Sequence, residues 1–309
     1  IFPFVSGARK MAREEPKKLF HCFRVGMALC LVSLFYYMNP LYEGFGQNVM
    51  WAVLTVVAVF EYSVGATVCK CLNRAVGTVS AGALAAGVHS ATVMLKGKYA
   101  KLVFLQLSLF LLVSGATFWR FAPPVKAQFD HGVVIFMATF TLVSVSGYRT
   151  DSLDLVQDRT ITIGIGVSMC IVMSMVFWPA WAGNELHNLI KANMEILSRS
   201  LDGTSIAGCF NKDSGDLNGK TRAEYDNLLD SKATEESLAN FARWEPVNRN
   251  FCSVHPWKEY LKLGDSIRSC ARIVDALDSV VNSETWAPNF MKDQFSKICV
   301  KLASNTSSI

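Results

Sequence analysis

Apolar residues gather in long blocks over most of the first 181 residues, and short polar stretches separate the blocks. A helix of roughly 20 apolar residues, rising 1.5 Å per residue, is long enough to cross a bilayer. The pattern therefore predicts six transmembrane helices. They are expected at Leu19–Met38, Val49–Val68, Leu72–Leu95, Lys101–Trp119, Gly132–Gly147 and Thr160–Trp178.

The pattern changes after Trp178, where charged residues become dense. Segments such as NELHNLIKANMEILSRSL and LKLGDSIRSCARIVDALDSVVNS repeat apolar residues with a period of 3.6, which is typical of amphipathic helices. No alternation of the kind that predicts strands appears. We expect an all-α membrane protein with a cytosolic N-terminal segment over residues 1–18, a six-helix transmembrane domain over 19–181 and a cytosolic helical domain over 182–309.

Lysine and arginine in the short connections predict the orientation, because they are enriched on the cytosolic side of membrane proteins. With the N-terminus inside, both termini are cytosolic. The cytosolic side then carries Arg9, Lys10, Arg13, Lys17, Lys18, Lys70, Arg74, Arg120 and Lys126, and the outer side carries Lys96, Lys98, Lys101, Arg149 and Arg159.

Composition excludes several classes of function. The net charge is +5 and no basic run with interleaved aromatic residues occurs, so nucleic acid is not expected as a partner. The nine cysteines contain no CxxC pair, and the five histidines form neither a metal-ligand spacing nor a nucleophile arrangement. We therefore expect no enzyme, no metal site and no cofactor.

Two opposite charges stand inside the first two expected spans. Arg24 lies about six residues, or roughly 9 Å, into the first span, and Glu61 lies at a similar depth on the second. An acid inside a span costs about 2.5–3.5 kcal/mol on insertion scales, so such groups face the protein interior. Two interpretations stay open: a buried Arg24–Glu61 pair, or Arg24 reaching the cytosolic interface while Glu61 bonds to Ser63 or to main-chain groups.

Further cations stand near the ends of the expected spans. Lys70 and Arg74 are four residues apart, so they share a face if a helix continues through the turn that holds them. Cations at both ends of a narrow path attract anions and reject metal cations. For each residue alone, the alternative is an anchor to lipid phosphate or an orientation signal. The set as a whole predicts an anion pathway lined by Arg24, Lys70, Arg74, Arg120, Arg149 and Arg159.

Asp151, Asp154 and Asp158 stand in the expected outer loop, three and four residues apart and beside two arginines. On a helix they would form an acidic stripe that can hold a hard cation through oxygen ligands. The alternative is that they are solvated or paired with the flanking Arg149 and Arg159.

Several long segments of the chain resemble the plant aluminium-activated malate transporter family. They are WAVLTVVAVFEYSVGATVCKCLNRAVGT, VSVSGYR, PAWAGNELHNLI, FARWEPVNRNF and HPWKEYLKLG. The resemblance covers nearly the whole chain. It implies a homodimeric anion channel in the membrane lipid, with six spans per subunit and a cytosolic helical domain, that passes malate and other organic or inorganic anions.

The resemblance also implies roles for particular residues. It ties Arg24 and Glu61 to permeation and places a motif of the cytosolic domain at Trp244, Glu245 and Pro246. It offers Glu43, Asp151 and Asp154 as the acids of the outer loops, while the loop TDSLDL differs from the pattern of the aluminium-responsive members.

The expected mechanism is passive anion conduction, gated by voltage and by anions, in the plasma membrane or alternatively the vacuolar membrane. The rival is a secondary active carrier that exports organic acids. A carrier of that kind is expected to show helices interrupted by glycine or proline in paired repeats, whereas the prolines here stand at loop edges, at Pro40, Pro123, Pro124 and Pro179.

Overall fold

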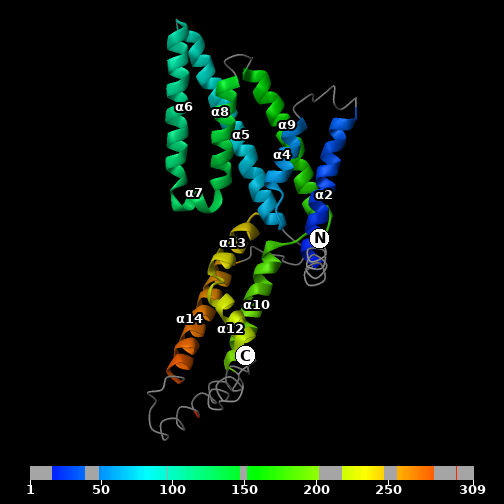
Figure 1. Ribbon diagram of the computed structural model, residues 1–309, viewed down its shortest axis with the longest axis vertical. Helices are drawn as coiled ribbons and strands as arrows, with labels where there is room; N and C mark the ends of the chain where they lie inside the picture. The colour runs from blue at the N-terminus through cyan, green and yellow to red at the C-terminus, as the bar shows by residue number, and fades with distance from the viewer. Residues whose placement is uncertain are drawn as a thin grey trace. The chain divides into compact units, whose positions relative to one another are not determined.

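The computed structural model describes residues 16–38, 49–95, 97–146, 152–201, 218–246, 256–281 and 297, and every regular element in these ranges is a helix (Figure 1). Contacts divide the chain into two compact units, unit 1 at Ile1–Trp181 and unit 2 at Ala182–Ile309. The boundary falls at the position where the density of charged residues rises in the sequence.

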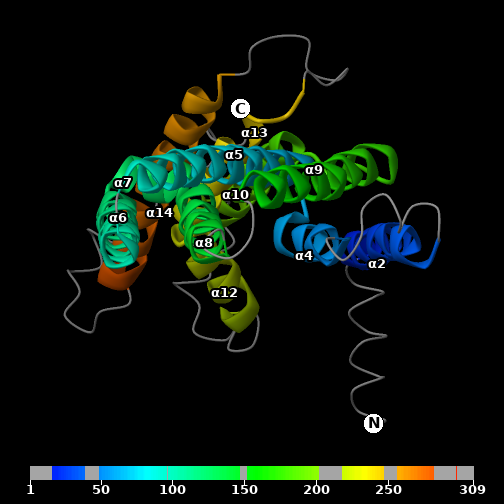
Figure 2. The same cartoon turned by 90° about the horizontal axis from the view of Figure 1, so that it is seen from above.

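Unit 1 is a row of helices packed side by side. Along the row α2 contacts α4, α4 contacts α9, α9 contacts α5, α5 contacts α8, and α8 contacts α6 (Figures 1 and 2). The short helix α7 joins α6 to α8 at the end of the unit where the chain also leaves α9, which we call the α7 end. The helices are α2 (Pro16–Tyr37), α4 (Val49–Val59), α5 (Val64–Met94), α6 (Lys98–Arg120), α7 (Pro123–Gln128), α8 (Asp130–Ser146) and α9 (Ser152–Val176).

Within the described residues, three helical stretches are long and apolar enough to cross a membrane: α5, α6 and Arg159–Val176 of α9. The apolar stretches Met50–Val59 and Asp130–Ser146 are shorter. The expectation of six spans therefore stays a prediction for the remaining helices.

The second expected span ends earlier than the sequence predicted. Instead of continuing from Val49 to Val68, the chain turns at residues 60–63. Ser63 caps the helix that follows, because its hydroxyl accepts the Ala66 N–H at 3.3 Å. The Thr67 hydroxyl donates to the Ser63 carbonyl at 3.0 Å and lies 3.1 Å from the Glu61 nitrogen, whose N–H it accepts. These side chains satisfy main-chain groups that the turn leaves without helical partners.

The expected turn CKCLNR is consequently helical. Lys70 and Arg74 stand in the second and third turns of α5, about 9 and 15 Å along the helix from Val64 at 1.5 Å per residue. The prediction of a turn here was wrong because Lys70 is paired with Glu61 and Arg74 is buried, so these charged residues do not end the helix.

Close contact between α5 and α8 depends on glycine. A Cβ atom at Gly77 would lie 2.6 Å from the Gly132 carbonyl oxygen, and one at Gly132 would lie 3.2 Å from the Asn73 carbonyl oxygen. The Asn73 amide donates to the Gln128 carbonyl at 2.7 Å, which joins α5 to the end of α7. The α7 end of this helix pair is thus held by main-chain contact.

Unit 2 contains the amphipathic helices that the sequence predicted. They are α10 (Ala182–Leu201), α12 (Asn218–Leu229), α13 (Lys232–Ala242) and α14 (Trp257–Val281). Apolar side chains from all four pack into one core, with α10 in contact with α13 and α14. The buried residues of this core are Leu186, Ile190, Tyr225, Leu228, Ala239, Ile267 and Ala271.

Candidate functional site

Arg24 is 1% exposed and joins three parts of unit 1. Its guanidinium donates to the Tyr62 carbonyl in the turn after α4, at 2.9 Å, and to the Trp178 carbonyl after α9, at 3.3 Å. The expected Arg24–Glu61 pair is therefore wrong: Arg24 is bound to main-chain carbonyls. The alternative, with the Arg24 side chain at the interface, does not describe this buried group either.

Glu61 forms an ion pair with Lys70 instead. Glu61 stands in the turn at residues 60–63, and Lys70 follows on the second turn of α5, so the two side chains meet at the start of this helix. The Glu61 side chain is 38% exposed and that of Lys70 is 31% exposed. Both side chains are therefore partly exposed at the surface of unit 1, and Glu61 stands in a turn, unlike the acid in mid-span that the sequence predicted.

Arg74 is buried, with 4% of its surface exposed. Its Nε atom has no hydrogen-bond partner, and within the described residues no carboxylate pairs with it. His131, at the start of α8, interacts electrostatically with both Lys70 and Arg74. Arg74 thus stands among cations, one turn above the Glu61–Lys70 pair.

Arg159 is also buried, at 6% exposure, and its guanidinium carbon lies 3.9 Å from the centre of the Trp51 ring on α4. This is a cation–π contact. In the described part of the chain Arg159 likewise has no carboxylate partner. Two buried guanidinium groups therefore stand on the neighbouring helices α5 and α9.

The sequence predicted that Arg159 begins the last span, as part of an outer ring of cations. Helix α9 starts earlier, at Ser152, so Arg159 lies about two turns inside the helix. The stretch of α9 that is long and apolar enough to cross a membrane nevertheless begins at Arg159. The place of Arg159 at the start of a span and in a ring of cations therefore stays a prediction.

The other predicted site residues lie apart from this pair. Arg120 ends α6 and forms an exposed ion pair with Asp130 at the start of α8, with one N–O distance of 3.0 Å. Asp154 and Asp158 lie in the first turns of α9, but their side chains are outside the described part of the structure. Arg149, Glu43 and Asp151 fall outside the described residues altogether.

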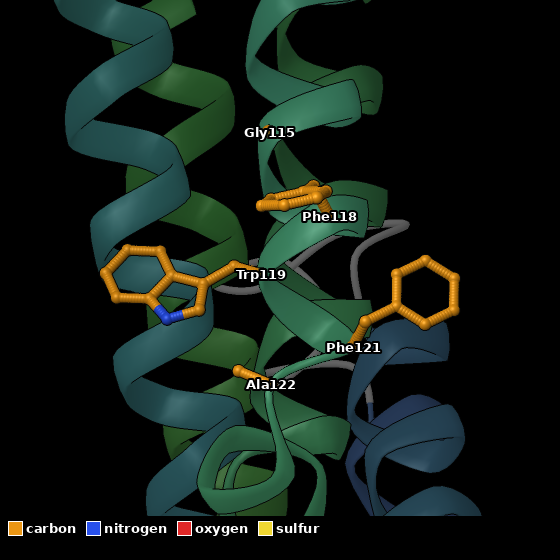
Figure 3. Close-up of a pocket in the computed structure, with 5 residues that line it drawn as sticks. All are labelled: Gly115, Phe118, Trp119, Phe121 and Ala122. Atoms are coloured by element: carbon orange, nitrogen blue, oxygen red, sulfur yellow. The ribbon is translucent and has the colours of Figure 1, made fainter.

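A shallow apolar pocket lies at the end of α6, next to α7 (Figure 3). Phe118, Trp119 and Phe121 extend from the helix in different directions around Gly115 and Ala122 (Figure 3). Helix α6, described over its whole length, buries none of its residues in unit 1. This surface suits apolar groups, so it is not a site for anions.

In unit 2, the predicted motif at residues 244–246 stabilises a helix end. The Glu245 carboxylate accepts the N–H groups of Ala182 and Gly183, the latter at 3.2 Å, at the first turn of α10. A carboxylate is favourable there because the helix N-terminus carries free N–H groups and partial positive charge. Trp244 is half-buried and Pro246 is exposed.

The sequence interpretation missed a buried polar cluster in unit 2. Glu235 is fully buried and forms an ion pair with buried Arg268. Its carboxylate also accepts a hydrogen bond from Ser231 at 2.9 Å and one from Asn193 at 3.2 Å. The signal was present in the sequence, since Glu235 stands at helical spacing between Leu228 and the buried Ala239 and Ala242, on an otherwise apolar face.

A family model described as "Aluminium activated malate transporter" matches residues 9–309 of the chain. The chain belongs to this family. It is 45% identical over its whole length to aluminum-activated malate transporter 10 of Arabidopsis thaliana and 42% identical over 98% of its length to transporter 2 of the same plant. It is 40% identical over 98% of its length to transporter 1 of wheat, Triticum aestivum.

The resemblance seen in the sequence is thereby confirmed. The chain spans 66% and 61% of the lengths of the two Arabidopsis malate transporters and 69% of the wheat protein. The relatives are named as transporters, so the family is not one of enzymes, as the sequence predicted.

For a member of the malate transporter family, the arrangement of cations in unit 1 reduces the number of residues that are candidates for an anion site. Of the six cations predicted to line an anion pathway, Arg24 is held by carbonyl groups, and Lys70 and Arg120 are paired with acids. Arg24, Arg74 and Arg159 are all buried guanidinium groups that have no carboxylate partner among the described residues, but Arg24 is held by two main-chain carbonyls, which leaves Arg74 and Arg159. These two form the candidate anion site.

Proposed function

We propose that this chain forms part of a passive pathway that conducts malate and other organic or inorganic anions across a plant membrane. The observation that supports it best is the pair Arg74 and Arg159, buried on adjacent helices without carboxylates in the described part of the structure. An unpaired buried charge is strongly unfavourable, so this arrangement favours a bound anion.

The two guanidinium groups act as weak anion sites. An anion between them replaces their mutual repulsion with attraction, and the planar N–H groups of arginine match a carboxylate. Because the charges repel each other and Lys70 lies nearby, a second anion entering at the α7 end displaces the first. Conduction then requires no rearrangement of the whole unit for each ion.

The remaining cations contribute at the ends of this pathway. Lys70 and Arg120 stand near the α7 end in ion pairs. Arg149 lies outside the described residues and stays a predicted contributor. Arg24 has a different task in this proposal: it holds the turn after α4 and the chain after α9 in place through their carbonyl groups.

The proposal also covers the oligomeric state of the protein and its orientation in the membrane. Two copies of the chain associate, each with six spans, with both termini on the cytosolic side of the plasma membrane. The helices of unit 2 support this dimer and influence gating by voltage and by anions. The exposed apolar surface of α6 faces lipid or the second copy.

Voltage clamp of cells that express the full-length protein tests the proposal. Malate, chloride and nitrate are exchanged on each side, and the reversal potential should follow the anion gradient. Arg74→Gln and Arg159→Gln should reduce the current, whereas Arg199→Gln, an exposed arginine of unit 2, should not. Malate flux without any anion current would instead favour the carrier, and wild-type currents from both variants would refute the assignment of the two arginines.

A further inference from the structure

The Glu61 carboxylate forms an ion pair with Lys70, one of the cations of the proposed anion pathway. Its partner, Lys70, stands in the second turn of α5, and both side chains are partly exposed. In the proposed pathway water reaches this partly exposed pair and competes for both charges, and an ion pair in contact with water is worth about 0–1 kcal/mol. A carboxylate that arrives from solution can therefore displace Glu61 from the Lys70 ammonium.

The turn that carries Glu61 is held from several sides. The Thr67 hydroxyl accepts the Glu61 N–H, and Arg24 donates to the carbonyl of the next residue, Tyr62. The N–H of Val64 donates to the Ala180 carbonyl at 2.9 Å. The Glu61 carboxylate is therefore held next to Lys70, and a permeant carboxylate has to compete with it to occupy the ammonium group.

Lys70 also lies close to the candidate anion site. Lys70 and Arg74 are four residues apart on α5, so they share one face of the helix, and Glu61 is paired with Lys70. With Glu61 in place, this face carries one negative charge against the two positive charges of Lys70 and Arg74. Without it, an approaching anion meets both cations.

We propose that Glu61 is a tethered competitor of the permeant anion: its carboxylate occupies Lys70 as a carboxylate of the substrate would, and so weakens anion entry at the α7 end. This inference rests on the proposed function and adds a residue that tunes its concentration dependence. The competitor acts more strongly on dicarboxylates such as malate than on chloride, because a dianion gains twice from each uncompensated cation.

The test measures current against malate concentration on the α7 side of the membrane, in patches that contain the full-length protein. Glu61→Gln keeps the size of the side chain and removes its charge. It should lower the half-saturating malate concentration roughly two- to fivefold, the range expected for a partly exposed ion pair. Glu236→Gln, an exposed acid of unit 2, is the matched control and should leave the concentration dependence unchanged.

A double-mutant cycle with Lys70→Gln decides whether Glu61 acts through Lys70. The effect of Glu61→Gln should disappear when Lys70 is already neutral. An unchanged half-saturating concentration in Glu61→Gln, or an equal shift with and without Lys70, would overturn the inference. Glu61→Asp keeps the charge but shortens the reach, so it should give an intermediate value and serves if Glu61→Gln does not reach the membrane.

The cycle separates the two proposals. A wild-type protein that is present in the membrane but passes no anion in either direction would refute the proposed function, and the inference about Glu61 with it. A wild-type protein that conducts malate while Glu61→Gln behaves identically would refute the inference alone.

Discussion

Buried charges are treated in opposite ways in the two units. In unit 2, Glu235 and Arg268 are buried together, and Ser231 and Asn193 complete the hydrogen bonds of the carboxylate. In unit 1, Arg74 is buried with an unpartnered Nε and with another cation as its electrostatic neighbour. The buried ion pair of unit 2 is thus compensated within the chain, whereas under the proposed function the charge of Arg74 is compensated by the permeant anion.

The largest loss of stability is expected when the buried acid of unit 2 is neutralised and its buried cation remains. Glu235→Gln removes the buried negative charge and leaves buried Arg268, among the described residues, with only the exposed Asp265, 3.6 Å away, so it should cost up to about 3–5 kcal/mol of stability. The thermal unfolding of purified full-length protein measures the loss. The control is Glu224→Gln, which breaks an exposed pair with Arg199 and should cost about 1 kcal/mol or less.

A second variant checks the cause. Adding Arg268→Met to Glu235→Leu removes both buried charges, so the double variant should be more stable than Glu235→Leu alone. Equal stability of these two proteins would mean that the buried pair is not what holds α13 against α14.

Removing a buried charge from unit 1, in contrast, should not lower the stability of the protein. Arg74→Met removes a buried charge that is repelled by Arg159, so the melting temperature in anion-poor solution should rise or stay constant. Wild-type protein should gain stability from added malate, about 2.7 kcal/mol at a concentration 100 times the dissociation constant, and Arg74→Met should gain much less. Lys191→Met, which removes an exposed cation of unit 2, should respond to malate like the wild type.

A loss of stability in Arg74→Met at every malate concentration would contradict this interpretation. It would show that Arg74 is compensated within the assembled protein, as Glu235 and Arg268 compensate each other, and the contrast between the units would not hold.

The positions of most helices follow from the sequence because long apolar blocks and amphipathic periods are local signals. The turn at residues 60–63 was missed because Glu61 was interpreted as an acid inside a span, although Ser63 is a good N-cap. The partners of Glu61 and Glu235 were also missed. Lys70 is near in sequence, but it was assigned to a turn; Arg268 comes from a helix distant in sequence, and helical spacing alone does not say which faces meet.

The motif at residues 244–246 offers a smaller test within unit 2. Glu245→Ala leaves the first N–H groups of α10 without their carboxylate and should cost about 0.5–2 kcal/mol, measured by thermal unfolding. Glu245→Gln retains an oxygen acceptor without the charge, so its cost should fall between those of the wild type and the alanine variant. Equal losses in the two variants would mean that hydrogen bonding by the side-chain oxygen contributes nothing here.

The smallest expected effect concerns how Arg159 is held without an acid. The Trp51 ring lies 3.9 Å from its guanidinium carbon, and a contact of this kind contributes about 0.5–2 kcal/mol. Trp51→Leu should raise the half-saturating malate concentration roughly twofold, because the anion must then order the guanidinium itself. Trp51→Phe keeps an aromatic face and should stay closer to the wild type, and Trp119→Leu, on the exposed end of α6, should change nothing. If leucine and phenylalanine at residue 51 gave the same concentration dependence, the aromatic face would be irrelevant to the anion site. Arg159 would then be positioned by helix packing alone. In this respect it would resemble the buried charges of unit 2, which the fold holds in place.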